Sequence, residues 1–276
     1  MGSVNRRVLP GFAPSLGFTL LYLTVLVLIP LAACVAKASS LTPQQFWTAV
    51  WTERAQAAYI LTLGASFVAA GLNVLFGVLI AWVLVRYEFP FKPLFDSLID
   101  LPFALPTAVA GLVYSNLYVK NGWLGRFLVP LGIEAAYSRL AIVLVLTFIG
   151  LPFVVRAVQP VLEGLEAELE EAAATLGATR RQTFRRVILP LLFPALITGF
   201  VLAFARALGE YGSVVFVSGY MPYKTEIAPV LVVARLEEFA YAEATAIAVV
   251  LLTISFVKLT VINLLEAWNK RHAFGT

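Results

Sequence analysis

The sequence predicts an all-α membrane protein with six transmembrane helices, and two observations carry this prediction. The 276 residues are 61% hydrophobic and only 13% charged, whereas a soluble domain carries about a quarter charged residues. Six segments are apolar over the roughly 20 residues that a spanning helix needs. They are residues 16–36, 58–85, 94–119, 140–159, 191–218 and 242–265. We expect residues 1–276 to form a single transmembrane domain.

The first apolar segment, residues 16–36, is expected to act as an uncleaved membrane anchor. Arg6 and Arg7 precede it, and the tripeptide AKA at 36–38 resembles a cleavage site, which favours the alternative of a signal peptide. The apolar stretch is longer than the roughly 7–15 residues of a signal-peptide core. We therefore count it as the first span.

Clustered basic residues predict the orientation of the chain. On one side of the membrane they flank the first span, join the second span to the third, fill the loop at 161–190 and follow the last span. The set consists of Arg6, Arg7, Arg86, Lys92, Arg180, Arg181, Arg185, Arg186, Lys270 and Arg271. Basic residues on the other side are single and partly balanced by acids. The positive-inside rule therefore places both the N- and C-termini and the loop at 161–190 in the cytoplasm.

The loop at 161–190 is an unusually polar stretch for so apolar a chain: VLEGLEAELEEAAATLGATRRQTFRRVILP. Its glutamates come early and its arginines late, and Gly177 interrupts a strong helix-forming run. A second helix is expected to start at Thr179 and to enter the next span at Pro190. The sequence thus predicts a helix–turn–helix elbow on the inner face of the membrane.

Two interpretations of this elbow are open. In the first it is a solvated loop, and for the arginines alone this is the simpler interpretation, because they satisfy the positive-inside rule. In the second it contacts another protein, since Glu171-Ala172-Ala173 is small enough for a close approach and Gly177 permits a sharp bend. A rigid elbow of this kind would pass motion from a soluble partner into the membrane.

Several functional classes are excluded by the residues present. The chain has no G-x-x-x-x-G-K-[ST] phosphate loop, no G-x-S-x-G and no H-E-x-x-H motif, so we do not expect an enzyme. One histidine and one cysteine, Cys34, argue against a zinc site, and we expect no metal. The net charge of +4 lies beside apolar runs, which fits membrane orientation and not nucleic-acid binding.

Two prolines open the third predicted span in LIDLPFALPTAVAGL. Pro102 and Pro106 each remove a backbone hydrogen bond, so the helix is expected to kink there. Membrane helices tolerate such kinks where the freed carbonyls face protein or a water-filled cavity. A packing kink and a contribution to a transport pathway are both consistent with this pattern.

Two charges lie within the fifth predicted span, in FARALGEYGSVVF. Arg206 and Glu210 are four residues apart, which puts them on one helix face. Arg206 is ~22 Å along this helix, past the membrane midplane. A self-neutralising pair or a gate, with Gly209 as a flexible neighbour, is favoured over direct ligation of a substrate.

The elbow resembles the signature loop of bacterial ABC-importer permeases. That pattern is Glu-Ala-Ala, three residues, Gly, nine residues, an aliphatic residue, one residue and Leu-Pro, here running from Glu171 to Pro190 with Val187 where the family usually has Ile. The resemblance implies the type I importer permease fold, with a coupling helix between the fourth and fifth spans that docks on a cytoplasmic ATPase. The coupling residues that it implies are Glu168, Glu170, Glu171, Ala172, Ala173, Leu176 and Gly177.

The chain is most similar to the sulfate/thiosulfate branch of these permeases, which is related to the molybdate permeases. The similarity is carried by ALGEYGSVVFVSG with MPYKTEIAP, and by GFTLLYLTVLVLIPLAA at the first span. It implies a bacterial inner-membrane location and import of an anion by alternating access. The partners that it implies are a second, different permease subunit, two ATPase subunits that hold ATP and Mg²⁺, and a periplasmic sulfate-binding protein.

Other functions remain open at this point. A molybdate or tungstate permease would work as a homodimer, and an ion-coupled carrier or channel would need no ATPase. A membrane scaffold without transport is disfavoured by the prolines and the buried charges, which cost stability without a pathway to serve.

Overall fold

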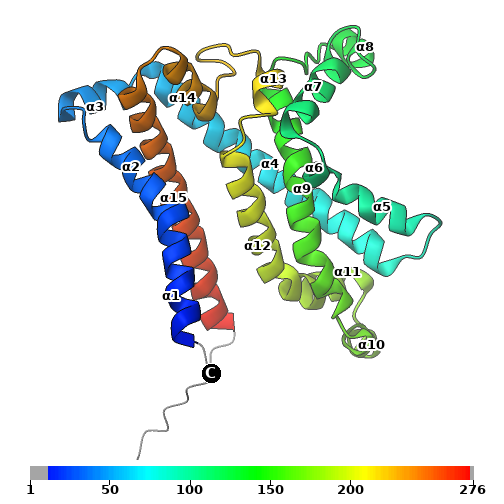
Figure 1. The fold of residues 1–276 in the computed structure, drawn as a ribbon. Coiled ribbons are helices and arrows are strands. Elements are labelled where there is room, and N and C mark those ends of the chain that lie inside the picture. The colour runs from blue at the N-terminus through cyan, green and yellow to red at the C-terminus, as the bar shows by residue number, and fades with distance from the viewer. Residues whose placement is uncertain (1–11, 274–276) are drawn as a thin grey trace, which may run out of the picture.

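The computed structural model describes residues 12–273, in which the regular structure is helical (Figure 1). α1 (Phe12–Leu23), a π-helical segment (Thr24–Leu28) and α2 (Ile29–Ala38) form one continuous rod over the first predicted span. α3 (Pro43–Val50) and α4 (Glu53–Arg86) follow. Both begin at a threonine, Thr42 or Thr52, whose hydroxyl accepts a backbone N–H of the first turn. Arg6 and Arg7 lie outside the described residues.

The third predicted span, 94–119, is not one helix, which corrects the sequence-based expectation. The structure forms α5 (Lys92–Ile99), α6 (Leu101–Ala104) and α7 (Thr107–Tyr118) instead. The chain is broken between α6 and α7 because Leu105, which precedes Pro106, is extended at φ −82° and ψ 129°. The expected kink at Pro106 is thus a full interruption, whereas Pro102 lies at the start of α6 and breaks nothing further.

The fourth predicted span is covered by α9 (Arg139–Glu163), which follows the short α8 (Gly125–Leu128) and a 3₁₀ turn (Val129–Leu131). The polar loop then forms α10 (Ala167–Thr175) and α11 (Arg180–Thr183). A π-helical segment (Phe184–Ile188) joins α11 to α12 (Leu189–Leu208) without a break. The expected helix–turn–helix is present, and its second helix runs straight into the fifth span.

The fifth predicted span, 191–218, is also wrong as a single helix. α12 ends at Leu208, and α13 (Val214–Ser218) is a separate turn of helix beyond Gly209–Ser213. α14 (Ala228–Glu237) and α15 (Tyr241–Ala273) complete the chain. Within the described residues, five helical stretches are long and apolar enough to cross a membrane, and the third predicted span is not among them. These are Pro14–Ala38, Glu53–Arg86, Arg139–Glu163, Arg180–Leu208 and Tyr241–Thr260.

The core lies where α4, α9 and α12 pack together. Val154 of α9 is fully buried at the centre of this contact. Gly77 of α4 and Gly199 of α12 both face it, and a Cβ atom at either glycine would come within 2.9 Å of a Val154 atom. Glycine at these two positions lets the three helices approach closely, as small residues do in membrane bundles.

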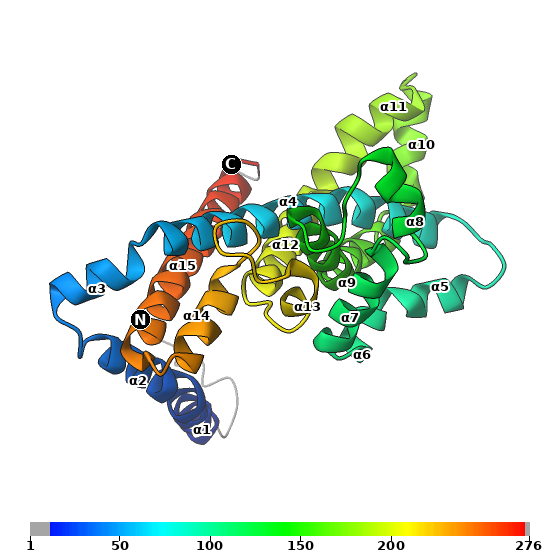
Figure 2. The same cartoon turned by 90° about the horizontal axis from the view of Figure 1, so that it is seen from above.

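The elements divide into two ends and two flanks. α2 packs against α15 on one flank, and α5 to α7 form the other in Figure 1. α1 begins and α15 ends at the lower end, where α10 also lies, and α3, α8 and α14 lie at the upper end. Seen from above, α4 runs across the whole molecule between the flanks (Figure 2). No residue in the most apolar stretch of Pro14–Ala38 is buried.

Candidate functional site

α10 forms an elbow at the lower end of the molecule, between α9 and α11 (Figure 1). Two nested backbone hydrogen bonds close its C-terminus. Ala178 N–H donates to the Ala173 carbonyl at 3.0 Å, and inside this bond Gly177 N–H donates to the Ala174 carbonyl at 2.9 Å. This pattern needs a left-handed residue at position 177, and Gly177 has φ +80°. The glycine therefore fixes the sharp turn that makes the elbow protrude.

One face of α10 points away from the protein. Leu176 at its tip is 88% exposed, which is unusual for a large apolar side chain. The side chains of Glu168, Glu171 and Ala172 are also exposed. An exposed leucine flanked by acids and a small residue is a surface suited to a complementary protein groove.

The other face of α10 points toward the spans. Ala173 is buried, and Glu170 is half-buried and accepts a hydrogen bond from the guanidinium of Arg86, the last residue of α4. The structure thus divides the seven residues expected at the coupling surface, because Glu170 and Ala173 face inward and the others are on the exposed side or at the turn.

The arginine-rich half of the elbow begins at Thr179. Its hydroxyl accepts Gln182 N–H at 3.4 Å, and the Gln182 side chain accepts Thr179 N–H at 2.8 Å, which forms a capping box. The four arginines that follow are exposed, and among the side chains that the structure describes none of them belongs to an ion pair; they are Arg180, Arg181, Arg185 and Arg186. Their arrangement fits contact with lipid headgroups or a partner surface.

The two interrupted spans meet each other at their breaks. Gly212, between α12 and α13, lies so close to Thr107 that a side chain at 212 would overlap the threonine hydroxyl. Gly111 of α7 contacts the backbone of Ser213, and the Ser115 hydroxyl donates to the Phe216 carbonyl at 2.6 Å. Non-helical backbone at membrane depth is tolerated where it is buried in protein or lines a cavity. The paired breaks therefore mark a candidate pathway.

Arg206 and Glu210 lie at this junction. An Arg206 nitrogen donates to Glu210 at 2.6 Å, although Glu210 lies just beyond the end of α12 and not on it. Glu210 is 2% exposed and also accepts both the N–H and the hydroxyl of Ser213, each at 2.9 Å. Its carboxylate is fully engaged within the protein, so the pair holds the broken end of α12 to the turn before α13. Gly209 has no atoms around it that a side chain would meet.

A second ionic cluster, which is partly exposed, was not expected from the sequence. Arg156 of α9 donates to both oxygens of Asp100, at 3.0 and 2.6 Å, and to Asp96 at 2.7 Å. These contacts hold α5 against α9 beside Pro102. An arginine inside the apolar stretch FVVRAVQP was the available signal, because charges within spans are rare and are usually paired.

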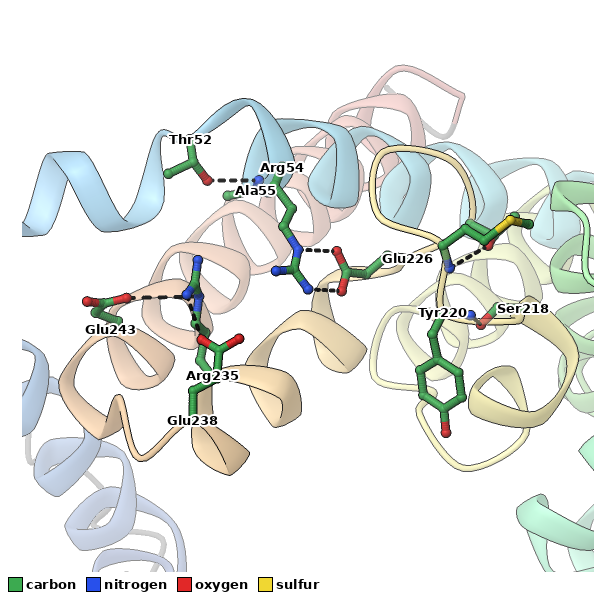
Figure 3. Close-up of polar contacts among 11 residues, drawn as sticks. Thr52, Arg54, Ala55, Ser218, Tyr220, Glu226, Arg235, Glu238 and Glu243 are labelled. Carbon is green, nitrogen blue, oxygen red and sulfur yellow. Dashed lines mark hydrogen bonds and ion pairs between the residues drawn. The ribbon is translucent and has the colours of Figure 1, made fainter.

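At the upper end, Arg54 and Glu226 form a two-pronged ion pair (Figure 3). Both hydrogen bonds are 2.7 Å, and they link the start of α4 to the turn that precedes α14. Arg235 of α14 pairs with Glu238 nearby at 2.7 Å. Nothing in the local sequence pattern predicts the Arg54 contact, because its partner is 172 residues away. Among the residues that the structure describes, no cluster of His, Cys, Asp and Glu could hold a metal ion.

Comparison with known proteins agrees with this geometry. Residues 73–273 match the family described as the binding-protein-dependent transport system inner membrane component. The chain is 49% identical over 271 residues to the sulfate transport system permease protein CysT of Salmonella typhimurium, covering 98% of each chain. It is 50% identical over 255 residues to the protein of the same name from Synechocystis, covering 92% of this chain and 89% of the relative.

Two solved structures share the fold. A bacterial ABC transporter involved in the import of the acidic polysaccharide alginate matches with a TM-score of 0.73 at 18% identity, over 92% of this chain and 94% of that one. The MetNI methionine ABC transporter, in an inward-facing conformation, matches with a TM-score of 0.57 at 17% identity, over 84% and 99%. At such identities the likeness concerns the fold alone.

Proposed function

This chain belongs to the family of inner membrane components of binding-protein-dependent transport systems, and from this membership we propose that it is a permease subunit of an ATP-driven sulfate and thiosulfate importer. One observation carries the choice of substrate. Relatives that are 47–52% identical over more than nine tenths of this chain are named sulfate transport system permease proteins. The chain is a transport subunit and not an enzyme.

The elbow would be the place where ATP hydrolysis enters the chain. An ATPase subunit would dock on the exposed face of α10, with Leu176 in an apolar groove and Glu168 and Glu171 beside it. ATP and Mg²⁺ would bind to that partner. The protruding turn at Gly177 supports this role, because it holds the exposed leucine clear of the spans.

The protein would cross the bacterial inner membrane several times, with α10 in the cytoplasm. α1 begins and α15 ends at the same end of the molecule as α10 (Figure 1), which supports cytoplasmic N- and C-termini. The binding protein would then approach the opposite end, where α3, α8 and α14 lie. A related alginate importer is described in complex with a periplasmic protein.

The working importer would contain a second, different permease subunit, two ATPase subunits and a periplasmic sulfate-binding protein. No residue is buried in the most apolar stretch of Pro14–Ala38, so this rod leaves a surface on which a second subunit could pack. Lipid or a second subunit must cover such a surface, because it is too apolar to face water.

Transport would proceed by alternating access around the paired breaks of the third and fifth spans. Pro106 and Gly212 would shape the gap, together with Pro102 and Gly209, and the Arg206–Glu210 pair would act as part of a gate. ATP binding on the partner would move α10, and the spans would rock between inward- and outward-facing states. The ATPase shifts this equilibrium only as far as its contacts with α10 differ between the two states.

Uptake of labelled sulfate tests the proposal. Membrane vesicles would contain the chain together with its partner subunits and binding protein, with sulfate competed by thiosulfate or by molybdate. We expect ATP-dependent uptake that thiosulfate inhibits more strongly than molybdate. Uptake without nucleotide that follows an ion gradient would refute an ATP-driven importer. Stronger competition by molybdate, with a single kind of membrane subunit in the purified complex, would refute the choice of sulfate.

A further inference from the structure

α10 has one polar link to the spans among the described residues, which is the ion pair between Glu170 and Arg86. Its other acids, Glu168 and Glu171, are exposed. Only Ala173 of α10 is buried, so apolar packing holds the elbow weakly. The ion pair is therefore a large part of what connects α10 to the bundle beyond its two chain ends.

An aromatic side chain, that of Trp82, also contacts Arg86. Its guanidinium carbon lies 5.3 Å from the centre of the Trp82 ring, one turn earlier on α4. A cation over a tryptophan face is attracted by the ring electrons. A positive side chain at the last residue of a helix is also favoured by the helix dipole. The Nε–H of Arg86 is buried and has no acceptor, so the guanidinium has donor capacity left for a second carboxylate oxygen.

Trp82 continues the connection toward α12. Its ring meets Phe184 edge to face, with centroids 5.6 Å apart and planes at 80°. Phe184 is the first residue of the π-helical segment that leads into α12. Glu170, Arg86, Trp82 and Phe184 thus form an unbroken series of contacts from the elbow through α4 to the base of α12.

This series of contacts reaches α4, which no short chain segment joins to α10. α10 is joined by short chain segments to α9 and, through α11, to α12, but α4 is 84 residues away in sequence at the Glu170–Arg86 contact. After Arg86 the chain turns at once into α5 and the broken third span, through Phe91 at φ +63°. A displacement of the end of α4 would therefore be felt at the segment that carries the Pro106 break.

We propose that Arg86 is a positioning residue that transmits movement of the docked elbow into α4 and the third span. This inference rests on the proposed docking of an ATPase on α10. The division of α10 into two faces makes both roles possible at once: Leu176, Glu168 and Glu171 are free to meet the ATPase while Glu170 is engaged with Arg86. Without this tether between Glu170 and Arg86, movement of α10 would reach α4 and the third span only indirectly, through their packing on α9 and α12.

The test uses the complete importer in proteoliposomes, with sulfate uptake and ATP hydrolysis measured on the same preparation. The variants are Arg86→Glu, Glu170→Arg and the double exchange. Each single exchange replaces attraction by repulsion, and we expect sulfate transported per ATP to fall by at least about fivefold, the lower end of typical coupling between sites. The ATPase subunits should still co-purify, and the double exchange should recover most of the coupling.

The pair is partly exposed, at 25% for Arg86 and 36% for Glu170, so its removal should change folding stability little. Glu168→Arg is the matched control, because it makes the same change of charge on the outward face of α10. We expect Glu168→Arg to weaken retention of the ATPase subunits. Combining it with Arg86→Glu should not recover sulfate transported per ATP, whereas the Arg86→Glu, Glu170→Arg double exchange should.

Each result decides between the tether and docking. Normal sulfate per ATP in both single variants overturns the tether, and so does a double exchange that is no better than the singles. Loss of the ATPase subunits in Arg86→Glu also overturns it, because the pair would then serve docking or assembly. Docking fails separately if Leu176→Asp keeps both the ATPase subunits and normal uptake.

Discussion

Gly111 of α7 packs directly on the backbone of Ser213, so that a Cβ atom at position 111 would lie 2.9 Å from the Ser213 Cα. The contact joins the helix after the break in the third span to the last residue of the break in the fifth. Since backbone atoms meet on the Ser213 side, no side-chain rotation relieves the overlap. The two interruptions therefore depend on each other.

Gly111→Ala should separate these two segments. We expect a loss of about 1–3 kcal/mol in stability, as is typical of overpacking in a tight contact, and a fall in sulfate uptake. Thermal unfolding of the purified complex in detergent measures the first effect. Gly71→Ala on α4 is the control, because no atom lies within 4 Å of a Cβ there. An equal loss in both variants would contradict the proposed contact.

The elbow was predictable from the sequence because its signals are local. Gly177 at the left-handed turn and the capping box that starts at Thr179 each act within a few residues. Arg206 and Glu210 were found for the same reason, since four residues separate them. The prolines indicated an irregularity in the third span, and the structure resolves it into a break where Leu105 is forced into an extended conformation.

The features that could not be predicted from the sequence depend on contacts between distant parts of the chain. The segment ALGEYGSVVF is apolar enough to continue as a helix. In the structure the helix is interrupted there, and Gly212 packs against Thr107 at the interruption. The pairs Arg156–Asp100 and Arg54–Glu226 join residues 56 and 172 positions apart. No spacing rule identifies such partners, and only the packing of spans brings them together.

Gly177→Ala should impair coupling through backbone strain alone. No atom lies within 4 Å of a Cβ at this position, but an L-residue at φ +80° is strained by about 1–2 kcal/mol. The turn should open, Leu176 should shift, and sulfate-stimulated ATP hydrolysis by the complex should fall severalfold.

Gly132→Ala is a close control for this strain. Gly132 has φ +78° and equally open surroundings, but it lies after the 3₁₀ turn near α8, remote from the elbow. We expect the same small loss of stability and normal coupling. If both variants lose coupling equally, the geometry of the Gly177 turn has no specific role.

Arg156→Lys should loosen α5 while keeping the charge. The guanidinium meets both oxygens of Asp100 and one of Asp96, a geometry that an ammonium group does not reproduce. We expect a loss of at most about 1 kcal/mol, because the cluster is partly exposed, and faster labelling of a cysteine placed at Ile99, which is buried at the end of α5. The same replacement at Arg180, which is exposed and is in no described ion pair, should change neither quantity.

Arg206→Gln and Glu210→Gln should differ in severity although they remove the same ion pair. Glu210 is 2% exposed, whereas the side chain of Arg206 is 34% exposed. Removing the arginine leaves a buried carboxylate with only the two Ser213 donors, which costs about 1–3 kcal/mol or more for a charged group. Removing the glutamate leaves an arginine that the protein encloses only in part.

We therefore expect Arg206→Gln to reduce sulfate uptake more than Glu210→Gln, and the double variant to recover part of the loss because no unpaired charge remains. Uptake and the yield of assembled complex are measured together for all three. If Arg206→Gln lowers uptake while assembly stays normal, the pair acts in the gate. If assembly falls in step with uptake and the double variant restores both, the pair only holds α12 to the turn before α13. The burial of Glu210 makes the order of the two single variants the decisive comparison, because a direct substrate ligand at Arg206 would give no rescue in the double variant.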